Sequence, residues 1–217
     1  MAQGAVLERG QAQHEGDKRR QILDGARTVF LSAGFDGASM GEIARAAGVS
    51  KGTLYVYFEN KEDLFEALIV QEKTSLAEAL FTLDADDPDV PGVLGRLGTS
   101  FLTEMCRPEH VSVVRMVIGA CEKFPRFGQA FYEAGPACGV ERLSGYLDAQ
   151  VAAGRLRIGD TELAARHFLH LCQAGLLTRL LLGAGGIAGN AEMRHQIDQA
   201  VRVFLAAYGP ERSGGRL

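Results

Sequence analysis

Hydroxyl and amine donors gather in one short stretch of the chain, GVSKGTLYVYF, at residues 48–58. If this stretch is a helix with about 100° between residues, Leu54 faces inward. The residues that then face outward are Gly52, Thr53, Tyr55 and Val56, with Lys51 at the N-terminal end. A recognition helix presents its N-terminal side chains to base edges in the major groove of DNA. The spacing therefore predicts a DNA-contacting face.

Each of these residue types suits contact with DNA. Lys51 can donate to guanine O6 and N7. The hydroxyls of Thr53, Tyr55 and Tyr57 can donate to phosphate oxygens. Gly52 costs about 1 kcal/mol inside a helix, and close approach of the backbone to DNA would account for it. The alternative, a small solvated helix whose tyrosines only pack, leaves the outward donors unexplained.

Capping signals place this stretch among short helices. Ser39 and Glu42 have the spacing of a capping box, and Ser50 and Asn60 are N-cap residues for the next two helices. The turn at residues 48–50 contains glycine and separates two short helices, as in a helix-turn-helix motif. We therefore expect three short helices followed by a long one.

The residue types at positions 48–58 also suit a β-strand. Caps bound the stretch at both ends and no second strand is nearby, so we expect the helical context to override local propensity. Lys61 opens the long helix that follows. There, a cation and backbone N–H groups can hold a phosphate together.

The sequence predicts an all-α fold of about nine helices. Its expected parts are a disordered arm (1–16), a helix-turn-helix domain (17–61), a larger helical domain (62–209) and a disordered tail (210–217). In the larger domain, Asp87 precedes Pro88 as an N-cap, and Pro136 should kink or break a helix over 125–153. Asp160 should open a nearly uniformly apolar helix that reaches Leu182.

Composition limits the function classes. The net charge is −4, but residues 1–61 hold eight Lys and Arg against seven Asp and Glu, a net +1, so any DNA-facing surface must be local. No apolar run is long enough for a membrane span or a secretory signal, which favours the cytoplasm. No nucleophile–base pair or phosphate loop stands at a recognisable spacing, so an enzyme is not expected.

Cysteine and histidine spacings give no metal site. The four cysteines contain no C-x-x-C pair, which argues against a zinc ribbon or a disulfide framework. His167 and His170 stand at i, i+3 but lack a further ligand at matched spacing. We expect no metal and no cofactor, with the histidines at a dimer seam or near a ligand.

Residues 22–69, and above all GVSKGTLYVYFENKEDL, resemble the N-terminal domain of TetR/AcrR-type bacterial transcriptional regulators. The resemblance implies an all-helical homodimer that leaves its DNA operator when a small molecule binds the C-terminal domain. The DNA contacts implied by position are Ser39, Lys51, Gly52, Thr53, Tyr55, Tyr57 and Lys61. Gly41 stands where some members carry a base-reading side chain, so base reading should rest more on residues 51–57. FPRFGQAFYEAGP, at 124–136, resembles the C-terminal domain of an AefR-like subgroup.

The apolar helix over 160–182 independently favours self-association, because an exposed apolar face of that size marks an interface. Two-fold symmetry is the commonest arrangement, and paired recognition helices predict a pseudo-palindromic operator. The residues expected at the dimer interface are Leu163, His167, Leu171, Leu176, Leu180, Ile197, Val201, Phe204 and Leu205.

The effector is expected to be a small apolar or amphipathic molecule. Its candidate pocket residues are Phe101, Met105, Met116, Cys121, Phe127, Phe131, Phe168 and Cys172. Each of these also suits ordinary core packing at helical spacing. Two other readings stay open for the protein: a ligand-independent architectural DNA-binding protein, and a thiol-redox-responsive regulator.

Overall fold

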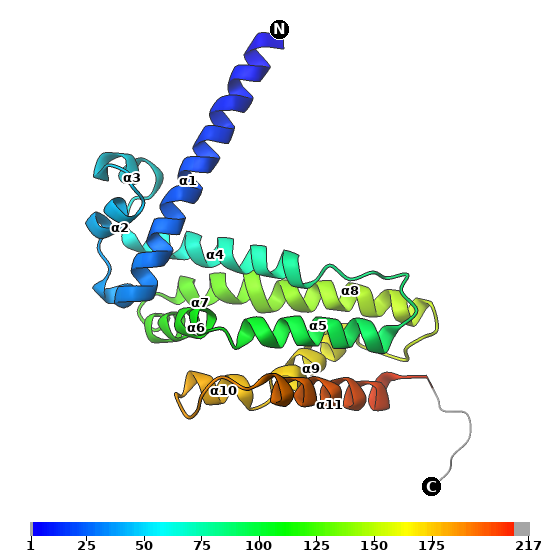
Figure 1. Cartoon of the computed structure of the whole chain (residues 1–217). Coiled ribbons are helices and arrows are strands. Elements are labelled where there is room, and N and C mark those ends of the chain that lie inside the picture. The colour runs from blue at the N-terminus through cyan, green and yellow to red at the C-terminus, as the bar shows by residue number, and fades with distance from the viewer. Residues whose placement is uncertain (1, 211–217) are drawn as a thin grey trace. The chain divides into compact units, whose positions relative to one another are not determined.

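The computed structural model describes residues 2–210, with side chains from residue 15 onward. This part of the chain consists of helices joined by loops and contains no strand (Figure 1), which confirms the predicted all-α fold. It divides into two compact units. The first unit comprises Met1–Glu72 and Met116–Phe131, and the second comprises Lys73–Arg115 and Tyr132–Leu217. The first unit thus extends beyond the expected boundary at residue 61 and includes a segment from the middle of the chain.

The first unit carries the short N-terminal helices. Its elements are α1 (Ala2–Gly37), α2 (Met40–Ala46), α3 (Lys51–Tyr57), the first part of α4 (Lys61–Leu80), the end of α6 (Pro108–Ala120) and most of α7 (Pro125–Tyr132). The apolar stripe of α1 is buried, with Ile22, Leu23 and Ala26 fully enclosed. Gly34 interrupts the helical backbone at φ 73°, a left-handed value that glycine adopts readily.

The N-terminal arm differs from the prediction. Helix α1 begins at Ala2, so residues 2–16, expected to be a disordered arm, are helical in the structure. The stretch lacks an apolar stripe. Such a stripe indicates that a helix is buried on one face, so its absence does not exclude a helix. Its alanine, glutamine, glutamate, leucine and arginine residues are good helix formers and extend the helix that starts the core. Beyond Pro210, the predicted tail lies outside the described residues.

An aromatic cluster attaches the middle segment to the first unit. The Phe127 ring centroid lies 5.2 Å from that of Phe35 and 5.1 Å from that of Phe65. The guanidinium of Arg126 binds the carboxylates of Asp63 at 2.8 Å and Glu66 at 3.0 Å. Helix α7 is therefore held on α1 and α4 by edge-to-face rings and a forked ion pair.

Gly25 lets α1 and α2 approach closely. A Cβ at this position would stand 2.5 Å from the backbone nitrogen of Ala47 and 2.6 Å from its Cα. Because backbone atoms cannot move aside cheaply, we expect Gly25→Ala to lower the free energy of unfolding by about 1–3 kcal/mol, the usual cost of overpacking. Thermal denaturation followed by circular dichroism measures this as a lower Tm.

Gly16→Ala is the matched control on the same helix, since no atom lies within 4 Å of a Cβ added there. It should leave Tm unchanged or raise it slightly, because alanine favours helices over glycine. Equal Tm values for the Gly25→Ala variant and the unaltered protein would contradict the close packing of α1 on α2.

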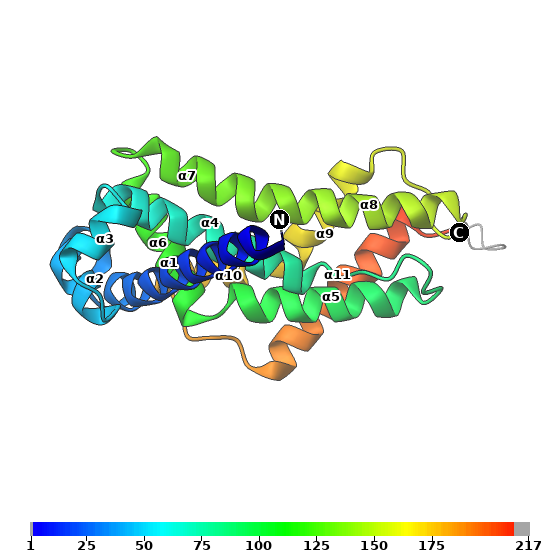
Figure 2. The same cartoon turned by 90° about the horizontal axis from the view of Figure 1, so that it is seen from above.

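The second unit is a helical bundle. Its elements are the end of α4, α5 (Val90–Met105), the start of α6, the π-helical turn η1 (Glu133–Ala137), α8 (Cys138–Ala152), α9 (Thr161–Gln173), α10 (Leu176–Leu181) and α11 (Asn190–Tyr208). Helix α9 packs against α5, α8 and α11, and α5 also packs against α11 (Figure 2). Leu94, Leu147 and Phe168 are fully enclosed in its core.

Several element boundaries differ from the sequence prediction. Helix α5 is capped by Asp89, whose Oδ1 accepts from Gly92 N at 3.0 Å, and not by Asp87. The helix expected over 160–182 is broken at Gly175, where φ is 78°. The helix expected over 125–153 is divided by η1, which contains Pro136. Residues 2–210 therefore form more helices than the nine expected, because two of the expected helices are each divided.

Candidate nucleic-acid interface

Helix α3 forms as the capping signals predict. The hydroxyl of Ser50 accepts from Thr53 N at 3.0 Å and lies 2.8 Å from Thr53 Oγ1. Asn60 Oδ1 accepts from Asp63 N at 2.8 Å at the start of α4. These caps satisfy backbone donors that a helix end leaves open. Lys51–Tyr57 are helical and not a strand, and only Phe58, which ends the helix, has an extended backbone.

The side chains of α3 separate as the helical geometry predicts. Leu54 is fully buried, whereas Tyr55 is 53% exposed and Val56 is 81% exposed. Lys51 and Gly52 are also exposed, and Thr53 and Tyr57 are half-buried. At this exposure, packing within the described part of the first unit does not account for the valine. The methyl groups of Val56 suit contact with a thymine methyl group.

Lys51 lies across helix α2 at Gly41. A Cβ at Gly41 would stand 3.0 Å from Lys51 Cε and 3.3 Å from Lys51 Nζ. The missing side chain at Gly41 thus makes room for the lysine. Some members of the resembling family carry a base-reading side chain at the position of Gly41. In this chain the Lys51 side chain, which is itself expected to read bases, lies beside that position.

Ser39 is engaged within its own capping box. Its hydroxyl lies 2.6 Å from Glu42 Oε2, its backbone N–H donates to the same oxygen at 3.1 Å, and its Oγ accepts from Glu42 N at 3.3 Å. The hydrogen bond from the Ser39 side chain lowers the pKa of Glu42 below its ordinary value. Ser39 thus positions α2, and a phosphate contact would require its hydroxyl proton to turn away from Glu42.

Lys61 is held at the end of α1. Its Nζ donates to the carbonyl of Asp36 at 3.3 Å and lies 4.6 Å from the ring centroid of Phe35. The side chain is half-buried, so part of it remains accessible. Lys61 is positioned beside the start of α4, where a phosphate is favoured by the helix dipole.

The sequence reasoning missed Arg19. Its guanidinium lies 5.2 Å from the ring centroid of Phe58, the residue that ends α3, and the side chain is exposed. This places another exposed cation beside the C-terminal end of α3, at a distance typical of a cation–π contact. The available signal was the basic run at residues 18–20.

The candidate ligand residues fall in both units. Phe101, Phe168 and Cys172 are buried in the core of the second unit, and Met105 packs against that core. Met116, Cys121, Phe127 and Phe131 belong to the first unit. Phe127 is fully buried in the aromatic cluster described above. The structure therefore gives Phe127 a definite packing role.

Two negative observations apply to the described residues alone. Between residues 2 and 210, no helix combines the length and apolarity needed to cross a membrane. Among the same residues, no group of three or more His, Cys, Asp and Glu side chains could hold a metal ion.

Family models match two regions of the chain. Residues 22–68 match the model of bacterial regulatory proteins of the tetR family. Residues 92–210, more than half of the chain, match the C-terminal domain of AefR-like transcriptional repressors. The first match covers α2 and α3, and the second covers α8 to α11.

Curated relatives resemble the N-terminal region. The chain is 36% identical over 75 residues to the HTH-type transcriptional regulator AcrR of Shigella flexneri, covering 35% of each protein. It is 38% identical over 69 residues to the HTH-type transcriptional repressor AcnR of Corynebacterium glutamicum, covering 30% of this chain and 37% of that protein. The chain thus spans about a third of the length of these relatives.

Solved structures resemble nearly the whole chain. A TetR-family regulator from Mesorhizobium loti has a TM-score of 0.85 at 28% identity, with 89% of this chain and 98% of that chain covered. The flavonoid-responsive regulator FrrA has a TM-score of 0.75 at 33% identity, with 91% of this chain and 100% of that chain covered. These proteins are regulators of transcription and not enzymes. The chain therefore belongs to the TetR family of transcriptional regulators and carries an AefR-like C-terminal domain.

Proposed function

We propose that this protein is a cytoplasmic repressor that binds a pseudo-palindromic operator as a homodimer and is released by a small amphipathic ligand. The outward face of α3 is the observation that carries the proposal. Lys51, Tyr55 and Val56 combine a cation, a hydroxyl and an apolar group, all of them exposed, on a helix held firmly by its caps. These groups suit guanine, phosphate and thymine in turn.

An exposed apolar face supports the homodimer. A hollow of about 550 Å³ is lined by α9 and α11 residues, which are His167, His170, Leu171, Ala174, Val203, Phe204, Ala207 and Tyr208. Leu163 and Val203 on the same helices are 42% and 45% exposed. Contiguous apolar surface of this kind favours a protein partner, and a second copy satisfies it with two-fold symmetry.

The exposed residues refine the expected interface. Leu176, Leu180, Ile197 and Phe204, which the sequence places at the interface, are buried in the core of their own unit. Leu163 and His167 are exposed and Leu171, Val201 and Leu205 are half-buried, so these five can meet a partner. His167 Nδ1 lies 2.8 Å from the Tyr208 hydroxyl, which links α9 to α11 beside this face.

The effector class is supported by apolar composition and by one relative. The second unit has a large apolar core, which suits a ligand with an apolar body. The relative FrrA is named as flavonoid-responsive, and a flavonoid is both aromatic and hydroxylated. We therefore propose an aromatic or otherwise apolar molecule with polar groups. A ligand-independent architectural protein remains the competing proposal, which effector release of DNA would exclude.

Burial of the thiols bears on the redox alternative. Cys106 and Cys172 are buried, and Cys121 and Cys138 are half-buried. Burial raises the pKa of Cys172 to about 12, so the reactive thiolate form is about one part in ten thousand of this side chain near pH 8.

We expect two thiols, those of Cys121 and Cys138, to react quickly with a disulfide reagent in the native protein, and all four thiols to react in denaturant. A third fast thiol would contradict this burial and strengthen the redox alternative.

Selection of genomic fragments by the purified full-length protein tests the proposed function. We expect a small set of fragments to be enriched, each with a footprint whose two half-sites are related by a two-fold axis. Salt should weaken binding steeply, because phosphate contacts release counterions. Uniform recovery of fragments, or footprints without half-sites, would contradict a sequence-specific dimer.

A further inference from the structure

One stripe of helix α9 is exposed along the length of the helix. Leu163, His167, His170 and Ala174 stand at i, i+4, i+7 and i+11, so they share one face. All four residues are exposed, whereas Phe168 on the inward face is fully buried. This is the spacing at which two helices pack along a common seam. Histidines therefore occupy two of the four seam positions.

The two histidines also border the hollow of about 550 Å³ between α9 and α11. The residues that line it with them are Leu171, Ala174, Val203, Phe204, Ala207 and Tyr208. Among the described residues of this lining, none is a carboxylate, a lysine or an arginine. Histidine is the side chain type that ordinarily changes its charge between pH 5 and 8. The charge of this surface in that range is therefore set by the two imidazoles.

The hydrogen bonds of the two imidazoles do not supply a negative charge. His170 Nδ1 lies 2.8 Å from the Arg166 carbonyl, which only accepts, so Nδ1 carries a proton and the neutral ring leaves Nε2 bare. His167 Nδ1 lies 2.8 Å from the Tyr208 hydroxyl, which donates to a neutral ring or accepts from a charged one. Neither partner carries a charge that would stabilise an imidazolium.

The charged groups nearest the stripe lie on its flanks. Arg166 binds Glu162 at 2.6 Å on the flank of α9 that faces α8, where α8 contributes Glu141 and Asp148. On α11, Arg202 Nε donates to a neutral amide oxygen at 3.0 Å. Helix α5 packs on the inward face of α9 instead. The stripe itself contains no carboxylate.

We propose that two copies associate through this stripe with His167 and His170 neutral, so that the homodimer weakens as the pH falls. This rests on the proposed function, in which the protein acts as a homodimer. Around a two-fold axis each copy presents the same face, so a charged stripe meets its own charge in the partner. A neutral apolar stripe is self-complementary. Cover by a second copy also disfavours the charged form of an imidazole.

The direction of the pH effect follows from proton linkage. The free chains bind more protons than the dimer, because the dimer excludes the charged imidazoles. Association is therefore fully favoured above the pH range in which histidine ionises, and it is lost progressively as the pH falls through that range.

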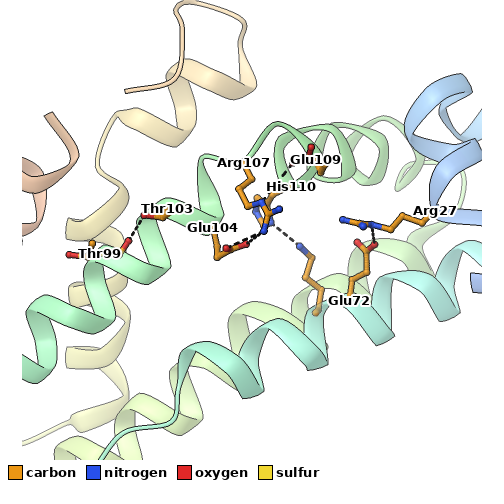
Figure 3. A network of polar contacts seen from close by, with 9 residues as sticks. Arg27, Glu72, Thr99, Thr103, Glu104, Arg107, Glu109 and His110 are labelled. Atoms are coloured by element: carbon orange, nitrogen blue, oxygen red, sulfur yellow. Dashed lines mark hydrogen bonds and ion pairs between the residues drawn. The ribbon is translucent and has the colours of Figure 1, made fainter. Parts of the chain in front are cut away.

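The other described histidines serve as references. His110 Nδ1 lies 3.1 Å from Lys73 Nζ, an interaction marked by the dashed line to His110 in Figure 3. Burial, together with the positive charge of Lys73, lowers the pKa of His110 to about 3. His110 is therefore neutral throughout the range of interest. His195 is exposed on α11 but does not line the hollow, so His195→Gln is the matched control.

Sedimentation equilibrium of the full-length protein at about pH 8 and about pH 6.2 tests the proposal. Because an ordinary histidine is half charged near pH 6.5, each histidine position, counted over two copies, should weaken the dimer by about tenfold at the lower pH. The unaltered protein should thus dimerise about a hundredfold more weakly there. The double variant His167→Gln/His170→Gln should lose this difference, and His195→Gln should keep it.

His170→Leu provides a second measurement if the double variant no longer dimerises. It removes one ionisable group and keeps the seam apolar, so its dimer should be at least as tight as that of the unaltered protein at pH 8. Its pH difference should fall to about tenfold. Because His170 is exposed, circular dichroism should show an unchanged fold.

The outcomes separate the proton linkage from the proposed function. Equal dimer affinity of the unaltered protein at the two pH values would overturn the linkage and leave the homodimer intact. A pH difference that is unchanged in His170→Leu and in the double variant would also overturn it. A difference lost only when His167 and His170 are replaced supports it. A monomer at pH 8 would overturn the proposed homodimer and the linkage together.

Discussion

We expect the Lys51→Ala variant to bind the operator about ten to one hundred times more weakly than the unaltered protein. A lysine or arginine that contacts a guanine edge contributes about 1–3 kcal/mol of discrimination, which corresponds to a factor of about 5 to 150 and includes the expected loss. The expected loss is large because Lys51 stands at the N-terminal end of α3, where a recognition helix meets the bases. Fluorescence anisotropy with a labelled operator duplex measures the change.

The controls for Lys51→Ala are chosen to separate base contact from general charge. Arg142→Ala removes an exposed cation from α8 and should leave operator affinity nearly unchanged. Tyr55→Phe removes one hydroxyl and should have a smaller effect on operator and nonspecific DNA alike. Because Lys51 is exposed, its removal should not change Tm. An operator affinity equal to that of the unaltered protein would contradict the assigned face.

We expect Phe127→Ala to lower the free energy of unfolding by about 3–5 kcal/mol, the usual cost of emptying a buried aromatic site. The Phe127 ring is fully buried and lies 5.1–5.2 Å, centroid to centroid, from Phe35, Phe65 and Phe124. Its loss should loosen α7 from α1 and α4 within the first unit. Urea denaturation followed by circular dichroism measures the change in stability.

Ile118→Ala is the matched control for Phe127→Ala, because Ile118 lies in the same middle segment but is 59% exposed. It should change stability by less than about 1 kcal/mol, as surface substitutions usually do. Equal effects of the two substitutions would contradict the assignment of residues 116–131 to the first unit. A selective loss of stability in Phe127→Ala would support it.

Local signals explain why the N-terminal helices were predictable. The capping box of Ser39 and Glu42, and the caps at Ser50 and Asn60, depend on residues three positions apart and are confirmed. The inward position of Leu54 follows from helical periodicity alone. Strand-like residue types at positions 51–57 did not prevent a helix, because the caps and neighbouring helices outweigh weak propensities.

Long-range packing explains what the sequence could not predict. The contacts of Phe127 with Phe35 and Phe65 join residues more than sixty positions apart, so the division into units did not follow the expected boundary. Lys73 and His110 are 37 positions apart and carry no local pattern. Apolarity alone also did not distinguish Phe204, buried in its own unit, from Leu163, which is exposed.

The most direct test of the account is the affinity of the full-length protein for its footprinted operator, measured by anisotropy beside a duplex in which both half-sites are scrambled. We expect the operator to bind at least about a thousand times more tightly than the scrambled duplex, with two chains per operator. Lys51→Ala should reduce that ratio. Equal affinity for the two duplexes would contradict sequence recognition by α3 and, with it, the proposed repressor function.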